Sequence, residues 1–110
     1  MTEHTTEHTT EHMKGKVIVI TGAAGGFGRL VSAKTAAMGA LAVCADVNAA
    51  ELDITVESIV AQGGAATALV TDVTELTQMQ ALAGHALDTY GRIDVWINNA
   101  GTMPLAFHAD

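Results

Sequence analysis

The chain has 110 residues, 49% of them hydrophobic and 15% charged, which excludes a disordered chain, and 11 Gly against one Pro exclude a collagen-like one. Five basic against 12 acidic residues give a net charge of −7, which argues against binding to nucleic-acid phosphates. No apolar run reaches the ~20 residues of a membrane span, the first twelve residues lack the apolar region of a secretory signal, and Cys44 has no second cysteine to pair with. We therefore expect one soluble, acidic domain in the cytoplasm.

Residues 1–12 differ in character from the rest of the chain. After Met1, Thr, Glu and His repeat with a period of four residues, which spaces His4, His8 and His12 at i, i+4. On a helix this spacing would align three ligands for a soft divalent metal. Threonine is a poor helix former and the segment is short, so we expect a disordered leader, native or added for expression, with only incidental metal affinity and no functional metal site. The folded domain is predicted to span residues 13–110.

Short apolar runs alternate with segments of helical periodicity from residue 16 onward. The apolar runs predict strands at 17–21, 41–46, 66–71 and 93–98. The first predicted helix spans 27–38 and ends at Gly39. The second follows Asn48 as N-cap, with Glu51 completing a capping box, and ends at Gly63.

The third predicted helix follows Thr74 as its N-cap and ends at Gly91. Its apolar stripe is predicted to contain Leu76, Met79, Ala83, Ala86, Leu87 and Tyr90. His85 lies off this stripe and is expected at the surface. Cys44, inside a predicted strand, is expected to be a small core residue rather than a nucleophile.

Strands that alternate with helices of this length are typical of βαβ units and a parallel sheet. Right-handed crossovers place the first two helices on one face of that sheet. The dinucleotide-fold strand order 3-2-1-4 then places the third helix on the opposite face. We therefore predict an α/β, partial Rossmann fold, a doubly wound parallel sheet of four strands with three helices.

A glycine-rich stretch, Thr21-Gly22-Ala23-Ala24-Gly25-Gly26-Phe27-Gly28, leads from the first predicted strand into the first helix. Gly22 permits a tight turn, while Gly26 and Gly28 leave room for a pyrophosphate and for close packing of the helix on the sheet. The N–H groups and partial positive charge of a helix N-terminus favour an anion there. The position between strand and helix predicts a dinucleotide-binding turn, and an ordinary glycine-rich turn is the alternative.

Asp46 ends the second predicted strand, 18 residues after Gly28, near the ~20 residues that separate the glycine turn from a ribose-binding acid. Its carboxylate would accept hydrogen bonds from the ribose hydroxyls of NAD. It would repel the 2′-phosphate of NADP by roughly 4 kcal/mol at ~4 Å and an effective dielectric of about 20. No Lys or Arg lies within residues 22–28, so NAD is predicted over NADP. A solvated strand end is the alternative.

Two further groups follow the third and fourth predicted strands. Asp72 is a predicted acceptor for the adenine amino group with Val73 against the base, and a helix cap beside Thr74 is the alternative. The sequence Asn98-Asn99-Ala100-Gly101 would leave room beside the nicotinamide ribose at the carboxyl edge of the sheet. Without context, the same four residues are equally a turn.

In this order and spacing, the glycine turn, Asp46, Asp72-Val73 and Asn98-Asn99-Ala100-Gly101 resemble the short-chain dehydrogenase/reductase family over residues 14–110. The resemblance implies an oxidoreductase that transfers hydride between a nicotinamide dinucleotide and an alcohol or carbonyl substrate. It assigns the pyrophosphate to Gly22, Gly26, Phe27 and Gly28, and the adenosine ribose to Asp46. It assigns the adenine to Asp72 and Val73, and the nicotinamide side to Asn99, Ala100 and Gly101.

The family's catalytic Ser and Tyr-x-x-x-Lys find no counterpart in this sequence. The only tyrosine, Tyr90, is followed four residues later by Asp94, and no lysine follows Lys34. We therefore expect the cofactor-binding, amino-terminal part of a longer enzyme, inactive by itself. An unpaired fourth strand would make it marginally stable or self-associating. A non-catalytic dinucleotide-binding module and a non-functional truncation are the alternatives.

Overall fold

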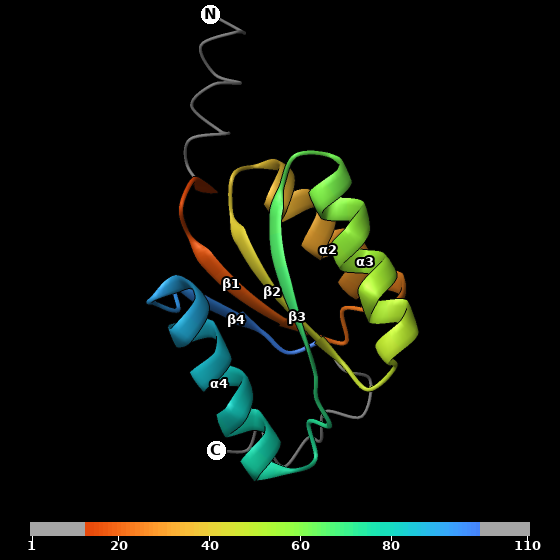
Figure 1. Cartoon of the computed structure of the whole chain (residues 1–110), viewed down its shortest axis with the longest axis vertical. Helices are drawn as coiled ribbons and strands as arrows, with labels where there is room; N and C mark the ends of the chain where they lie inside the picture. The colour runs from red at the N-terminus through yellow and green to blue at the C-terminus, as the bar shows by residue number, and fades with distance from the viewer. Residues whose placement is uncertain (1–12, 100–110) are drawn as a thin grey trace, which may run out of the picture.

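A parallel sheet with helices on both faces forms the described part of the computed structural model, residues 13–99 (Figure 1). Its strands are β1 (Val17–Thr21), β2 (Leu41–Asp46), β3 (Ala65–Val70) and β4 (Val95–Ile97), and its helices are α2 (Gly26–Ala37), α3 (Ala49–Ala61) and α4 (Leu76–Tyr90). The strand order β3-β2-β1-β4 confirms the predicted partial Rossmann topology. The leader predicted at 1–12 lies outside the described residues, as do Ala100 and Gly101.

Two hydrophobic cores lie on opposite faces of the sheet. Because successive side chains of a strand point to opposite faces, Ile18 and Ile20 of β1 pack beneath α2 and α3, whereas Val17 and Val19 pack beneath α4. All five residues of β1 are buried, as its continuous apolar run predicts. Figure 1 shows α2 and α3 together on one side of the sheet and α4 alone on the other, which confirms the predicted crossovers.

Cys44 and Tyr90 are both packed against these cores, as predicted. Cys44 is fully buried with a free thiol, and burial raises the pKa of that thiol to about 11. Tyr90 is half-buried against the core beneath α4, and burial raises the pKa of its hydroxyl. Burial therefore favours the protonated, uncharged form of each group and does not activate either one as a nucleophile.

The predicted element ends are wrong by a few residues in several places. β3 begins and ends one residue earlier than predicted, and so does the first helix, α2. β4 spans three residues instead of the six predicted at 93–98. The side chain of Asp94 explains its late start, because Oδ2 of Asp94 accepts the N–H of Val17 at 2.8 Å. A carboxylate thus takes the place of a ladder carbonyl at that end of the strand pair.

The helix ends confirm the Asn48 cap and the predicted terminating glycines, and they contradict the Thr74 cap; Gly39 and Gly63 follow α2 and α3 with φ of 96° and 90°. Oδ1 of Asn48 accepts the N–H of Glu51 at 3.0 Å, and Gly91 ends α4 with a φ of 82°. The second half of the predicted capping box is not formed, because the carboxylate of Glu51 pairs with Arg29 instead. Thr74 is not the N-cap of α4. That position is Glu75, and the Thr74 hydroxyl donates to Oδ1 of Asp72 at 2.6 Å.

The face that α4 turns to the sheet also differs from the prediction. Its buried residues are Leu82 and Ala86, whereas Leu76 is 72% exposed and Leu87 is 49% exposed. His85 is half-buried rather than fully at the surface as predicted, and its Nε2 lies 3.0 Å from Oγ1 of Thr67 on β3. The hydrogen bond between His85 and Thr67 favours a helix orientation in which His85 faces the sheet. Hydrophobic periodicity alone does not predict this orientation.

No helix in the described range 13–99 is both long and apolar enough to span a bilayer.

Candidate functional site

The glycine-rich turn lies at the carboxyl edge of the sheet, where β1 ends and α2 begins. β2 ends on one side of it with Asp46, and on the other side β4 leads into Asn99. The helices that follow β1 and precede β4 lie on opposite faces of the sheet. This is the topological switch point, the place where open α/β sheets bind their ligands.

Gly22 and Gly26 are needed for their backbone conformation, and Gly28 is needed for space. Gly22 has a φ of 68° and Gly26 a φ of 54°, both in the left-handed region that side chains other than glycine disfavour. A Cβ on Gly26 would meet no atom within 4 Å, so the space above that residue is open. A Cβ on Gly28 would lie 1.9 Å from the carbonyl oxygen of Gly22 and 2.6 Å from Nδ2 of Asn99.

The start of α2 presents backbone donors to this open space. Within the described residues, no hydrogen-bond acceptor contacts the N–H groups of Gly26, Phe27 or Gly28. Gly25 is the N-cap and supplies no side chain to cover them, and the first turn carries no acidic residue. The N-terminal end of a helix dipole adds about half a positive charge, so the arrangement suits a bound anion.

Asp46 faces the glycine turn from the end of β2. Its Oδ2 accepts the N–H of Ala24 and its Oδ1 accepts the N–H of Asn48, each at 3.0 Å. These bonds hold the half-exposed carboxylate at the edge of the sheet beside the turn. Each carboxylate oxygen can accept a second hydrogen bond, so capacity for an external donor remains.

Asp72 lies just beyond β3, close to the end of β2, since the N–H of the preceding Thr71 donates to the carbonyl of Asp46 at 2.9 Å. Oδ1 of Asp72 accepts from both the N–H and the hydroxyl of Thr74, at 2.9 and 2.6 Å. These hydrogen bonds lower the pKa of the Asp72 carboxyl group. The local turn therefore uses one carboxylate oxygen of Asp72, and contact of Asp72 and Val73 with adenine stays a prediction.

Asn99 ties the end of β4 to the glycine turn. Its N–H donates to Oγ1 of Thr21 at 3.0 Å, and its Nδ2 donates to the carbonyl of Gly22 at 3.3 Å. The sequence predicted a place beside the nicotinamide, and the structure adds this structural contact, which no local pattern indicated. Ala100 and Gly101, predicted to lie on the nicotinamide side, are outside the described residues.

Sequence reasoning missed Arg29, which follows the glycine turn directly. Its guanidinium donates to the carbonyl of Ala24, to Oγ1 of Thr55 at 2.9 Å and to the carboxylate of Glu51 at 2.9 Å. Arg29 lies one residue beyond the stretch 22–28, which contains no Lys or Arg. A signal was present, because a cation in the first turn of a helix is unfavourable and calls for a nearby acceptor.

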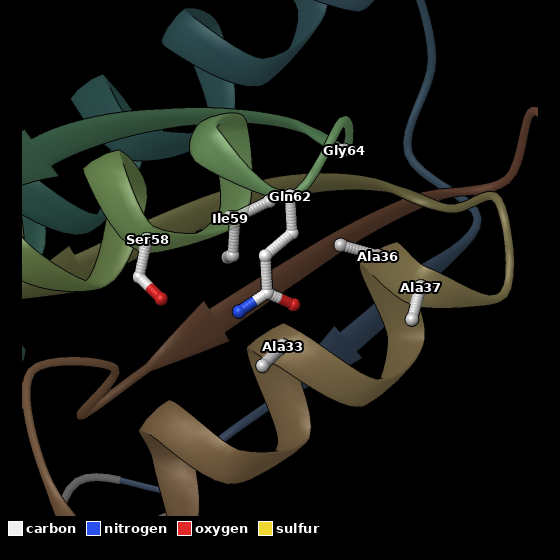
Figure 2. Close-up of a pocket in the computed structure, with 7 residues that line it drawn as sticks. All are labelled: Ala33, Ala36, Ala37, Ser58, Ile59, Gln62 and Gly64. Atoms are coloured by element: carbon white, nitrogen blue, oxygen red, sulfur yellow. The ribbon is translucent and has the colours of Figure 1, made fainter.

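A small cavity of about 40 Å³ lies between α2 and α3, away from the glycine turn (Figure 2). Its lining residues are uncharged and come from the second halves of both helices and the loop before β3: Ala33, Ala36, Ala37, Ser58, Ile59, Gln62 and Gly64. Both helices run back from the carboxyl edge of the parallel sheet, so this cavity lies toward the opposite edge. Residues 13–99 contain no cluster of His, Cys, Asp and Glu that could hold a metal ion.

Residues 16–110 match the family model described as short chain dehydrogenase. The chain belongs to this family. It corresponds to the amino-terminal portion of the family, and the match begins one residue before β1.

Similar proteins of known structure or activity are much longer than this chain. The 7alpha-hydroxysteroid dehydrogenase of Escherichia coli is 37% identical over 89 residues, which cover 81% of this chain and 35% of the enzyme. A short-chain dehydrogenase/reductase from Burkholderia phymatum in complex with NAD matches with a TM-score of 0.75 and 42% identity, over 76% of this chain and 30% of that one. A metagenomic short-chain oxidoreductase in complex with NADP matches with a TM-score of 0.76 and 33% identity, over 86% and 47%. The chain spans about a third of the length of the curated relatives that it matches.

Proposed function

We propose that this chain binds NAD and is the cofactor-binding part of an oxidoreductase that moves hydride between the cofactor and an alcohol or carbonyl compound. One observation carries the proposal. The carboxylate of Asp46 and the N–H groups of Gly26, Phe27 and Gly28 flank the same edge of the sheet. Family membership and the NAD and NADP complexes of similar structures support it.

The residues present fit a dinucleotide. The N–H groups at the start of α2 would hold the pyrophosphate, and the open space above Gly26 would admit it. Asp46 would accept hydrogen bonds from the adenosine ribose. Asp72 and Val73 are proposed for the adenine, and Asn99, Ala100 and Gly101 for the nicotinamide side. When bound, the nicotinamide ring accepts or donates the hydride.

NAD is proposed over NADP because of the charges at the end of β2. Asp46 would repel a 2′-phosphate by roughly 4 kcal/mol at ~4 Å and an effective dielectric of about 20. Arg29, the cation that directly follows the turn, is already paired with Glu51. The similar structures contain either cofactor, so the preference rests on these residues rather than on the family.

We propose that this chain binds the cofactor and that neither Tyr90 nor Ser32 donates a proton to the substrate. Tyr90 is the last residue of α4, shortly before the chain enters β4. At the start of β4, Asp94 accepts the N–H of Val17, the first residue of β1. Tyr90 therefore lies toward the amino edge of the sheet, opposite the glycine turn. Ser32 is buried, and its hydroxyl donates to the carbonyl of Gly28 at 2.8 Å. Proton transfer and substrate choice are therefore assigned to groups outside residues 13–99 or to a partner.

Calorimetric titration of the 110-residue chain with NAD and NADP tests the proposal. We expect binding of NAD in preference to NADP. Asp46→Asn should weaken NAD binding about tenfold or more, since hydrogen bonds to a charged acceptor are worth ~1.5–3 kcal/mol. The same change should strengthen NADP binding relative to NAD, because the repelling charge is gone.

Glu57→Ala is the matched control, because it removes an exposed carboxylate from the middle of α3. It should leave both affinities within about twofold of the unaltered chain. Failure of the unaltered chain to bind either dinucleotide would refute the proposal. An unchanged preference in Asp46→Asn would refute the role of Asp46 alone.

A further inference from the structure

We propose that Thr55 and Arg29 position Asp46 for the adenosine ribose by clamping the Ala23–Ala24 peptide of the glycine turn. The inference rests on the proposed function, because positioning Asp46 matters only if that residue contacts the dinucleotide. Thr55 lies on α3, 32 residues from the carbonyl it contacts, and no motif of the glycine turn includes it. Both residues act through the backbone, so they are positioning residues.

One peptide group connects Thr55 to Asp46. The hydroxyl of Thr55 donates to the carbonyl of Ala23 at 3.0 Å. The N–H of the same peptide belongs to Ala24, and it donates to Oδ2 of Asp46 at 3.0 Å. The peptide plane between Ala23 and Ala24 is thereby held at both ends, by a helix on one side and by the ribose-binding acid on the other.

Arg29 completes this chain of hydrogen bonds. Its Nε donates to Oγ1 of Thr55 at 2.9 Å, so the hydroxyl must direct its own proton elsewhere, and the carbonyl of Ala23 is its shorter acceptor. The guanidinium also donates to the carbonyl of Ala24, the next peptide along. Hydrogen bonds linked in series polarise one another, which strengthens the hold on the carboxylate at the far end.

The hydrogen bond from Thr55 to Ala23 is buried, so its loss should be costly. The side chain of Thr55 is 1% exposed, and Ala23 and Ala24 are 0% and 5% exposed, so water does not readily replace a lost bond. The Arg29–Glu51 pair is more open, with side chains 36% and 49% exposed, and by itself it adds little stability. The ion pair instead orients the Arg29 guanidinium. This planar group donates to Thr55, Ala24 and Glu51 at once, which a lysine ammonium could not do in the same geometry.

The opposite side of the turn is held independently. Asn99 anchors Gly22 from β4, without contact with Thr55 or Arg29. Loss of the clamp should therefore loosen the Ala23–Ala24 peptide and its bond to Oδ2 of Asp46, while Oδ1 keeps the N–H of Asn48 and the segment near β4 stays in place. The measurable consequence is a change in the discrimination between NAD and NADP, since the proposed function assigns to Asp46 the distinction between a free 2′-hydroxyl and a 2′-phosphate.

Titration of the 110-residue chain and its variants with NAD and NADP tests the clamp. Thr55→Val replaces the hydroxyl by a methyl group of similar size, and Thr55→Ser retains the hydroxyl. We expect Thr55→Val to weaken NAD binding about tenfold and to reduce the NAD-to-NADP affinity ratio. Thr55→Ser should keep that ratio within about twofold. A general loss of folded protein would lower both affinities equally and leave the ratio unchanged.

Thr35→Val is the matched control, because its hydroxyl bonds only to carbonyls of its own helix, α2. It should leave the ratio unchanged. Arg29→Met tests the clamp independently if Thr55→Val fails to fold. Arg29 is partly exposed, and its replacement removes the hydrogen bonds to Thr55 and to the carbonyl of Ala24. It too should reduce the ratio.

The outcomes separate the two proposals. If the unaltered chain binds no dinucleotide, the proposed function fails and the clamp fails with it. If the unaltered chain binds NAD while Thr55→Val or Arg29→Met keeps the original NAD-to-NADP ratio, only the clamp is overturned. A Thr55→Ser variant as defective as Thr55→Val would also overturn it, because the hydroxyl would then not be the group that matters.

Discussion

Gly28 lies where the chain entering α2 passes closest to the loop after β4. A Cβ there would overlap the carbonyl carbon and oxygen of Gly22 and Nδ2 of Asn99, and this oxygen and nitrogen are hydrogen-bonded to each other at 3.3 Å. A methyl group would have to separate them. Residue 28 therefore couples the glycine turn to β4, in addition to leaving its N–H available to a ligand.

Gly28→Ala should lower the free energy of unfolding by about 1–3 kcal/mol, the usual cost of overpacking, and abolish NAD binding. Urea unfolding and titration measure the two effects. Gly84→Ala is the control, because Gly84 lies inside α4 and a Cβ there meets no atom within 4 Å. That change should raise stability by up to ~1 kcal/mol through helix propensity. Equal stability of both variants would contradict this account of Gly28.

The conformational role of the glycines in the turn could be predicted from the sequence. The contacts that Asn99 and Thr55 make with the turn could not. Positive φ at Gly22 follows from a tight turn, and a turn is a local feature. The contacts from Asn99 and Thr55 join positions 78 and 32 residues apart. Only the packing of β4 and α3 against the turn brings these side chains to it.

Asn48 begins α3, and at the scale of this element its cap has a measurable effect. Oδ1 of Asn48 accepts the N–H of Glu51, one of the helix N–H groups without an intrahelical partner. Asn48→Ala should lower the free energy of unfolding by ~1 kcal/mol. In Asn48→Ser, most of the stability contributed by the cap should remain. Thermal and urea unfolding measure the stability of both variants. An Asn48→Ala chain as stable as the unaltered one would contradict the cap.

The two outer elements, α4 and β4, departed most from their predicted form. Within residues 13–99, α4 is the one helix on its face of the sheet, and Leu82, Ala86 and the polar His85 lie on its sheet-facing side. β4 pairs only with β1 in the described part of the chain, through three residues. Such elements have fewer neighbours to confine them, so individual side-chain bonds decide their rotation and length.

At the scale of the whole molecule, the β4 edge is the feature with the clearest consequence. Val95 is 40% exposed there, and an apolar strand edge invites pairing with another chain. We expect the 110-residue chain by itself to self-associate as its concentration rises, as measured by sedimentation velocity. Val95→Lys should suppress this association, because an edge lysine opposes strand pairing.

Val70→Lys is the matched control, since it places a lysine at the outer end of β3, on the other edge of the sheet. It should leave association unchanged. A chain that stays monomeric at every concentration, or that associates equally with Lys at position 95, would refute a role for the β4 edge.

The α/β class, the strand order, the faces of the helices and the glycine turn all follow from the sequence alone. Hydrophobic periodicity, the handedness of crossovers and the conformational freedom of glycine act over a few residues or apply to every parallel sheet. The tertiary structure alone decided the Arg29–Thr55 contact with the turn, the anchoring by Asn99 and the rotation of α4. These hydrogen bonds join residues far apart in the chain, so they depend on how the helices and β4 pack against the rest of the sheet.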